Sequence, residues 1–148
     1  MTEFHERLSP SWWLIVALFL AVPTSLLIFL PLSIPLGLLV GIVLWLGSVG
    51  ILWATAPVID LNGSELRAGP ARIDRRYISS IQPIEAEDAR AAKGVDLDAR
   101  AFLVIRPWIT PAIKVTLSDP DDPTPYWLIS SRHPRGFAAA FAQSGPDA

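Results

Sequence analysis

The stretch that decides the fold is apolar throughout: "WWLIVALFLAVPTSLLIFL" (Trp12–Leu30), "PLSIP" (Pro31–Pro35) and "LGLLVGIVLWLGSVGILWA" (Leu36–Ala54). No Asp, Glu, Lys or Arg occurs from Leu8 to Ile59, and such a run is too long for a core helix of a soluble protein. At about 1.5 Å per residue, each flanking segment nearly spans the ~30 Å of a hydrocarbon core. The prolines between them end the first helix. The sequence therefore predicts a transmembrane hairpin with spans at about 12–30 and 36–54.

A cleaved signal peptide is the alternative to a retained anchor. The tip "MTEFHER" has one arginine against two glutamates, which is a poor n-region. The apolar segment is longer than a signal-peptide core, and a second apolar segment follows it at once. We therefore assign residues 1–56 to an N-terminal tip and a retained hairpin.

Gly37 and Gly41 form a GxxxG motif within the second span. One interpretation is a face for dimerisation, and the other is close packing against the first span of the same hairpin. Folding the chain about Ser33 places Ser25 level with Gly41. Small residues then face small residues, which favours packing within the hairpin.

Two further residues of the spans bear on helix packing. Pro23 should kink the first span, and the hydroxyl of Thr24 or Ser25 can satisfy a carbonyl that the kink leaves free. Trp45 lies near the middle of the second span, away from the headgroup boundary that tryptophan prefers. It should therefore have a packing partner inside the membrane.

Basic residues lie only outside the hairpin. Arg7 precedes the spans, the connecting loop has no base, and four arginines follow: Arg67, Arg72, Arg75 and Arg76. The positive-inside rule then predicts that both termini are cytoplasmic, in a multi-pass protein of the cell (inner) membrane. The four arginines are either a contact with the inner leaflet or a topogenic signal with ordinary surface charge, and Asp74 among them weakens the first interpretation.

Residues 57–143 read as a cytoplasmic β-rich domain, followed by a disordered tail at residues 144–148. "VIDLNGSEL" predicts a hairpin, with Asn62 and Gly63 in a type I′ turn and Ile59 opposite Leu66. Further strands are expected at "ARID", "YISSIQPI", "AFLVIR", "AIKVTLS" and "YWLIS", with a short helix at "EAEDARAAKG".

The last predicted element is an amphipathic helix at "HPRGFAAAFAQ". Phe137 and Phe141 share one face at i, i+4, so they should plug one end of the β domain. The predicted fold class is α+β: a two-helix transmembrane hairpin, then a small pleckstrin-homology-like split β-barrel with a C-terminal helix.

The segment "DPDDPTPYWLISSR" (Asp119–Arg132) crowds carboxylates, prolines and aromatic residues together. Its prolines favour an extended chain, which spreads the carboxylates apart, and the central glycine and late glutamate of a calcium loop are missing. We therefore expect a rigid connection and a buried strand, without a metal. One face of that strand remains a possible interaction surface, formed by Tyr126, Trp127 and Arg132.

Composition argues against several functions. The chain has no cysteine, and neither His5 nor His133 has a spaced partner for metal binding or for activating a nucleophile. The net charge is −2 and there is no basic stripe with interleaved aromatic residues, so no nucleic-acid partner is expected. We expect no enzyme activity, no catalytic residue and no cofactor.

Four runs together resemble a known family: "ERLSPSWWLIVAL", "LNGSELRAGPARI", "DARAFLVIRPWI" and "SDPDDPTPYWLISSRHP". They resemble an uncharacterised family of small actinobacterial membrane proteins, described only as a domain of unknown function. The resemblance implies an integral membrane protein with a cytoplasmic domain and supplies no catalytic residue. The chain also looks like bacterial membrane proteins that carry a pleckstrin-homology-like domain. Their phosphoinositide-binding relatives have bases in the first strand loop, where this chain has "NGS".

The leading interpretation is a membrane-anchored, non-enzymatic module, whose β domain binds a protein partner or acts as a scaffold. A second interpretation is an accessory subunit, whose hairpin packs beside a transporter or an envelope enzyme. A membrane-bound enzyme is the third, and it lacks a convergent catalytic set. In each case the lipid bilayer and a protein are the expected partners.

Overall fold

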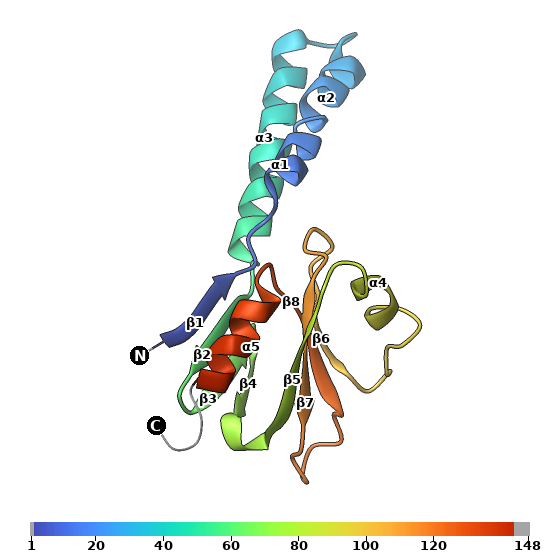
Figure 1. The fold of residues 1–148 in the computed structure, drawn as a ribbon. Helices are drawn as coiled ribbons and strands as arrows, with labels where there is room; N and C mark the ends of the chain where they lie inside the picture. The colour runs from blue at the N-terminus through green and yellow to red at the C-terminus, as the bar shows by residue number, and fades with distance from the viewer. Residues whose placement is uncertain (1, 144–148) are drawn as a thin grey trace. The chain divides into compact units, whose positions relative to one another are not determined.

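The computed structural model describes residues 2–143, so the predicted tail at 144–148 lies outside the described residues. The chain forms two compact units: the hairpin unit, residues 9–56, and the β unit, residues 2–8 with 57–143. The fold is α+β, as predicted, with apolar helices near the N-terminus, two sheets and a C-terminal helix (Figure 1).

The hairpin unit contains α1 (Trp12–Leu18), α2 (Ala21–Phe29) and α3 (Ile34–Ala54). Both arms, Trp12–Phe29 and Ile34–Ala54, are long and apolar enough to cross a membrane. The break between α1 and α2 confirms the kink expected from Pro23. Because proline has no N–H, it cannot donate to the carbonyl of Phe19, which instead accepts the N–H of Val22 at 3.0 Å. The Thr24 hydroxyl donates to the carbonyl of Leu20 at 2.8 Å, which also accepts the N–H of Thr24 at 3.2 Å, so this hydroxyl does not satisfy the carbonyl that Pro23 leaves free.

Sheet A is a four-stranded antiparallel meander in the order β1-β2-β3-β4. Its strands are β1 (Thr2–Arg7), β2 (Val58–Asn62), β3 (Glu65–Ala68) and β4 (Ala71–Asp74). Sequence analysis missed β1, because it grouped residues 1–56 with the hairpin. In the structure the tip pairs with β2, with Glu6 opposite Ile59 and Arg7 opposite Val58.

Alternation along the tip explains why it becomes a strand. Glu6 and Leu8 are buried, whereas His5 and Arg7 between and beside them are exposed. One charged side chain of the tip, that of Glu6, therefore points inward.

The register of the β2–β3 hairpin differs from the prediction. Leu61 lies opposite Leu66, Ile59 opposite Ala68 and Asp60 opposite Arg67, a shift of two residues. Gly69 is the one residue with positive φ, +60°, in the described part of the chain, so the turn is not type I′. An even shift keeps each side chain on its face and replaces an opposed Asp60–Glu65 pair by an opposed Asp60–Arg67 pair.

Sheet B has the order β5-β7-β8-β6, in which β6 runs parallel to β8 and the other pairs are antiparallel. Its strands are β5 (Ile78–Ile84), β6 (Phe102–Val104), β7 (Ala112–Leu117) and β8 (Tyr126–Ser130). A 3-10 turn, η1 (Arg75–Tyr77), joins the two sheets, and the short helix α4 (Ala89–Ala92) follows β5. Pro83 lies in β5, an edge strand, where a missing N–H costs little.

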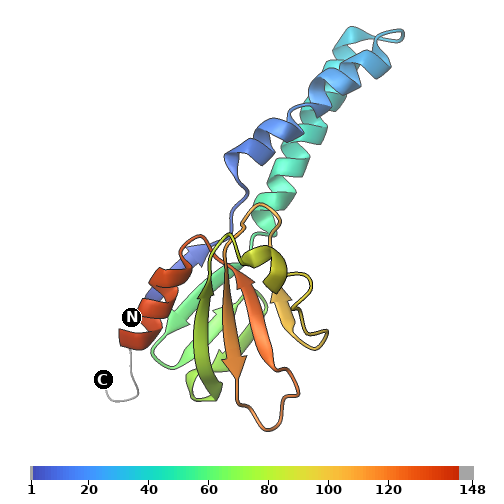
Figure 2. The same ribbon diagram turned by 45° about the vertical axis from the view of Figure 1, so that its right-hand side comes forward.

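The C-terminal helix α5 (Pro134–Gln143) lies against β1 and β5 (Figures 1 and 2). Phe137 is fully buried in the main core, and its ring meets the ring of Phe4 edge-on at 5.2 Å. Phe141 packs at the edge of the same core and is partly buried. The prediction that the apolar face of this helix is buried is confirmed.

Candidate functional site

The two glycines of the GxxxG motif lie against α2. A Cβ built at Gly41 comes 2.7 Å from Cα of Val22, and one built at Gly37 comes 3.0 Å from Cα of Leu26. The Cβ of Ser25 also lies 3.3 Å from that built at Gly41, so small residues do face each other. The motif therefore serves packing within the hairpin unit, where the backbones approach too closely for any side chain.

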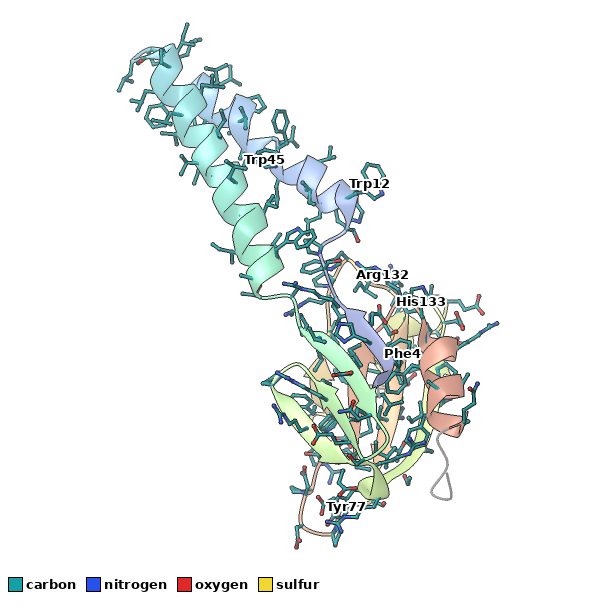
Figure 3. The ribbon with its side chains drawn as sticks, turned by 90° about the vertical axis from the view of Figure 1, so that its left-hand side faces the viewer. Phe4, Trp12, Trp45, Tyr77, Arg132 and His133 are labelled. Carbon is teal, nitrogen blue, oxygen red and sulfur yellow. The ribbon has the colours of Figure 1, made fainter. Side chains whose placement is uncertain are left out.

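Trp45 has the partner that its mid-span position requires. Its indole Nε1 donates to the carbonyl of Ile15 at 3.1 Å, and its ring meets Phe19 edge-on at 5.4 Å (Figure 3). Phe19 is the residue at the break between α1 and α2. The tryptophan thus ties α3 to the broken arm.

The outer surface of the hairpin unit is apolar. Leu20, Leu27 and Leu32 are 65%, 72% and 72% exposed, whereas Ser25 is buried at 5%. This is the reverse of a soluble protein, and it matches a segment whose surroundings are hydrocarbon.

The structure divides the four predicted arginines into two pairs. Arg67 lies opposite Arg72 on adjacent strands of sheet A, and Arg72 approaches Glu65 at 4.0 Å. Arg75 and Arg76 lie in η1, where the N–H of Arg75 donates to Ser64 at 2.9 Å. That second pair is therefore at the turn end of β2, one strand length from its start at Val58.

A cavity of about 720 Å³ surrounds the second pair, and we call it the η1 cavity. Its lining residues are Gly63, Ser64, Asp74, Arg75, Arg76, Ile78, Phe141 and Ala142. The guanidinium of Arg75 stacks 4.2 Å from the ring centre of Phe141 and also donates to that residue's carbonyl. Arg76 pairs with Asp74 at 3.4 Å. Cationic groups and apolar surface are thus combined around one cavity.

The predicted interaction surface on β8 is wrong for two of its three residues. Tyr126 and Trp127 are only 8% and 5% exposed, because β8 lies between β7 and β6 and has both faces covered. Trp127 packs in the main core beside Phe102, at 5.1 Å between ring centres. Arg132 alone is exposed.

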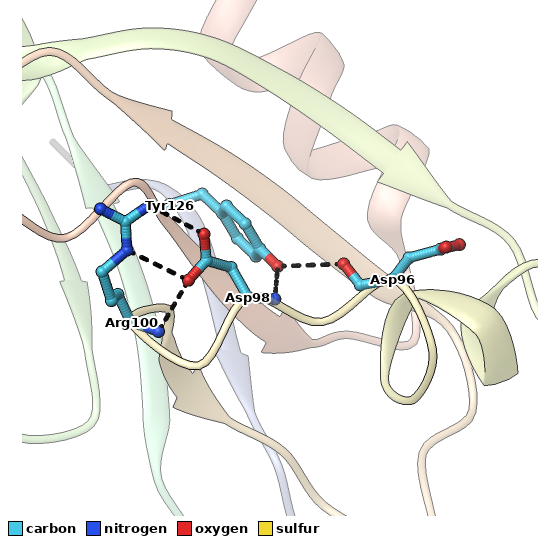
Figure 4. Close-up of polar contacts among 4 residues, drawn as sticks. All are labelled: Asp96, Asp98, Arg100 and Tyr126. Atoms are coloured by element: carbon cyan, nitrogen blue, oxygen red, sulfur yellow. Dashed lines mark hydrogen bonds and ion pairs between the residues drawn. The ribbon is translucent and has the colours of Figure 1, made fainter.

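Tyr126 instead anchors the loop that covers the outer face of sheet B. Its hydroxyl accepts the N–H of Asp98 at 2.8 Å and donates to the carbonyl of Asp96 at 3.5 Å (Figure 4). The Asp98 carboxylate pairs with Arg100 at 3.1 Å, and hydrogen bonding from that arginine lowers the pKa of Asp98. The tyrosine is thus part of the scaffold.

The acidic, proline-rich segment before β8 folds into two small turns. The N–H of Asp121 donates to the carboxylate of Asp119 at 3.0 Å, and that of Thr124 donates to Asp122 at 2.9 Å. Hydrogen bonding from Thr124, by its side chain first and then by its backbone, lowers the pKa of Asp122. Among the described side chains, those of residues 4–143, no three of His, Cys, Asp or Glu come together in a group that could hold a metal. The prediction that a buried strand follows is confirmed.

Sequence reasoning missed a buried carboxylate that joins the two ends of the chain. Glu6 is 8% exposed and accepts two hydrogen bonds, from the Ser131 hydroxyl at 2.5 Å and from the N–H of Arg132 at 2.8 Å. The N–H of His133 donates to the same hydroxyl at 3.1 Å. No motif marks contacts so distant in sequence, and the alternating pattern of the tip was the one available signal.

Replacing Glu6 with alanine is expected to lower the free energy of unfolding of the β unit by about 2 kcal/mol or more. The substitution leaves one buried donor, the Ser131 hydroxyl, and one partly buried donor, the N–H of Arg132, without an acceptor. A buried donor without a partner costs about 1–3 kcal/mol. Urea unfolding of the full chain in detergent, followed by tryptophan fluorescence, measures the change. Glu65→Ala is the matched control, because this exposed ion pair contributes less than about 1 kcal/mol. Equal midpoints for the two variants would contradict the assignment.

Ser130 and Lys93 also meet, at 3.4 Å between Oγ and Nζ. A serine nucleophile would need access to solvent and a lone pair on the lysine aimed at its hydroxyl. Ser130 is fully buried, and the Lys93 ammonium donates to the carbonyls of Ile109 and Thr110 at 2.9 and 2.7 Å. Burial lowers the pKa of Lys93. This geometry fastens the loop after β6 and is not that of a nucleophile with its base.

Comparison with known proteins gives a family and no activity. No curated protein matches the chain, and no solved structure does. One family model matches residues 3–141, which is nearly the whole length. The chain therefore belongs to the family described as protein of unknown function (DUF3093).

Proposed function

We propose that the chain is a non-enzymatic, multi-pass protein of the cell membrane. The hairpin unit spans the bilayer, and the β unit, on the cytoplasmic side, binds a protein partner through the η1 cavity. The apolar outer surface of the hairpin unit supports the membrane location.

Pairing of β1 with β2 supports a topology with both ends on one side. Arg7 lies opposite Val58, and the N–H of Leu8 donates to the carbonyl of Pro57 at 3.0 Å. If residues 9–56 cross the membrane, they must therefore leave and return on the same side. The arginines that flank the hairpin favour the cytoplasmic side.

A pleckstrin-homology-like plan for the β unit is part of the proposal. Four antiparallel strands form sheet A, three antiparallel strands (β5, β7 and β8) form most of sheet B, and a helix closes the chain. The short strand β6, parallel to β8, is an addition to that plan.

The single observation that carries partner binding is the η1 cavity. Its volume of about 720 Å³ lies within the usual range of ligand sites, ~300–1,000 Å³. Arg75 stacks on Phe141, and Arg76 and Ile78 also line the cavity, so an acidic partner segment with an apolar anchor would fit. Its position at the turn end of β2, away from Pro57, favours access from solvent.

Photo-crosslinking in native membranes tests the proposal. A photoreactive residue at Ser64, in the full-length chain, should give a discrete adduct with another protein. Arg76→Glu should abolish the adduct, because it reverses a charge that is 70% exposed and lines the cavity. Arg72→Glu, 60% exposed and outside the cavity, is the control. An adduct that survives Arg76→Glu, or that both variants abolish equally, would count against the site.

The accessory-subunit interpretation has one observation in its favour. A Cβ built at Gly47 or Gly50 of α3 meets no described atom within 4 Å, so another helix can approach closely there. Adducts from a photoreactive residue at Leu46, with none from Ser64, would favour this second function over the first.

A further inference from the structure

A cleft of about 260 Å³ lies between α4 and the loop that follows β6, and we call it the α4 cleft. Its lining residues are Ala89, Arg90, Lys93, Ile105, Arg106, Pro107, Ile109 and Thr110. Three of these are basic and none is acidic. A concentration of positive charge without any carboxylate is uncommon in a chain of net charge −2, and it is suited to an anion.

The two arginines of the cleft carry permanent charge. Arg90 is exposed, and its side chain makes no hydrogen bond or ion pair with residues 4–143, whose side chains the structure describes. Arg106 is half-buried, with its guanidinium 5.9 Å from the ring centre of Trp108. Lys93 lies beneath them and fixes the loop through two carbonyls. The hydrogen bonds of Lys93 therefore hold the loop that forms one wall of the cleft, and the Arg90 side chain can still bind a ligand.

Hydrogen bonds within the β unit locate the cleft at one end of the sheets. The N–H of Arg106 donates to Ser130 at 3.0 Å, and the N–H of Ser131 donates to Pro111 at 3.2 Å. The next residue, Arg132, donates through Nη1 to the carbonyl of Arg7 at 3.4 Å. Arg132 and Tyr77 lie at opposite ends of the β unit (Figure 3). The cleft is thus at the Arg132 end, away from the η1 cavity.

The Arg132 end is also where the chain enters and leaves residues 9–56, since Leu8 is bonded to Pro57 there. Only Ser9–Ser11 separate Leu8 from Trp12, the first residue of the predicted span. At about 3.5 Å per residue, this tether cannot exceed roughly 14 Å. In the proposed topology, with Trp12 at the membrane boundary, Leu8 is therefore within that distance of the headgroups.

We propose that the α4 cleft binds the phosphate of an anionic phospholipid headgroup, through Arg90 and Arg106. The proposal rests on the membrane location of the proposed function. It differs from a leaflet contact through Arg67, Arg72, Arg75 and Arg76, which have acidic neighbours: Asp60 and Glu65 in sheet A, and Asp74 at η1. No acidic residue lines the α4 cleft, where Nη1 of Arg106 donates to the carbonyl of Ile105 at 3.4 Å.

Titration of the full-length protein in detergent tests the assignment. The probes are short-chain phosphatidylglycerol, short-chain phosphatidylcholine and inorganic phosphate, followed by hydrogen–deuterium exchange. We expect phosphatidylglycerol to protect residues 89–94 and 105–110. Phosphatidylcholine should protect them weakly, because its choline offsets the phosphate charge, and inorganic phosphate should do so only at far higher concentration. Equal protection by inorganic phosphate would overturn the lipid assignment in favour of a free anion.

A matched pair of double variants separates the cleft from general surface charge. Arg90→Gln with Arg106→Gln should weaken phosphatidylglycerol binding about tenfold or more, given the contribution of each base near an anionic headgroup. Arg67→Gln with Arg72→Gln removes the same charge from sheet A and should change the affinity less than about twofold. The proposal is overturned if both pairs have the same effect, or if protection of the wild-type chain lies outside the cleft.

These measurements are independent of membrane insertion, because they are made in detergent. Carbonate extraction of native membranes tests insertion separately. If the chain stays in the membrane pellet but shows no selectivity for phosphatidylglycerol, lipid binding by the α4 cleft is refuted and the proposed membrane location is not. If carbonate releases the chain from the membranes, the proposal that the hairpin unit spans the bilayer is refuted.

Discussion

Replacing Phe137 with alanine is expected to lower the free energy of unfolding of the β unit by about 3–5 kcal/mol. The side chain is fully buried in the main core, edge-on to Phe4, and it comes from the helix that packs on both β1 and β5. Its loss leaves a cavity that touches both sheets. Because the free energy of unfolding of a small domain is only about 5–15 kcal/mol, this substitution should remove a large part of it.

Phe141→Ala provides the comparison for this first variant. It removes the same atoms from the same helix, but Phe141 is only partly buried and lies under Arg75. The loss should therefore be less than half as large. Urea unfolding of the full chain in detergent gives both values. Similar losses for Phe137→Ala and Phe141→Ala would mean that the helix does not plug the core as the structure has it.

The second large effect is expected for Gly41→Leu in the hairpin unit. The first atom of any side chain there would lie 2.7 Å from Cα of Val22, so the helices must separate along their closest contact. Overpacking in a rigid core costs about 1–3 kcal/mol, and a clash with backbone has no side chain that can give way. Gly50→Leu adds the same volume where nothing lies within 4 Å among the described residues.

Spin labels report the separation directly, because the chain has no native cysteine to remove. Labels at Leu27 and Leu39, both exposed, mark the two arms near the contact. Pulsed electron resonance should show a longer and broader distance distribution in Gly41→Leu and an unchanged one in Gly50→Leu. An unchanged distribution in Gly41→Leu would show that the glycines do not pack within the hairpin.

The elements that sequence analysis predicted are those whose signal is continuous along the chain. The charge-free run predicted both arms of the hairpin, and the spacing of Phe137 and Phe141 predicted the buried face of α5. Pro23 predicted the break between α1 and α2. Each of these features depends on residues within a few positions of one another, so neighbouring letters contain the necessary information.

The elements that it missed depend on distant partners. β1 is recognisable only beside β2, and the inward direction of Glu6 is explained only by Ser131 at the other end of the chain. The outer face of β8 looked available because periodicity does not reveal what covers a strand. In the structure the loop held by Tyr126 covers it. The Asn62-Gly63 signal was outweighed by the opposed charges of Asp60 and Arg67.

The pairing of β1 with β2 has a consequence for how the protein is made. During synthesis β1 leaves the ribosome first, and roughly 50 residues must follow before its partner strand exists, a closure that is entropically costly for a free loop. Insertion of the intervening segment into a bilayer brings its two ends together and removes much of that cost. A nascent chain that fails to insert keeps an unpaired β1 and a bare edge on β2, which exposes it to aggregation and proteolysis. In the proposed topology, completion of the sheet would therefore depend on membrane integration.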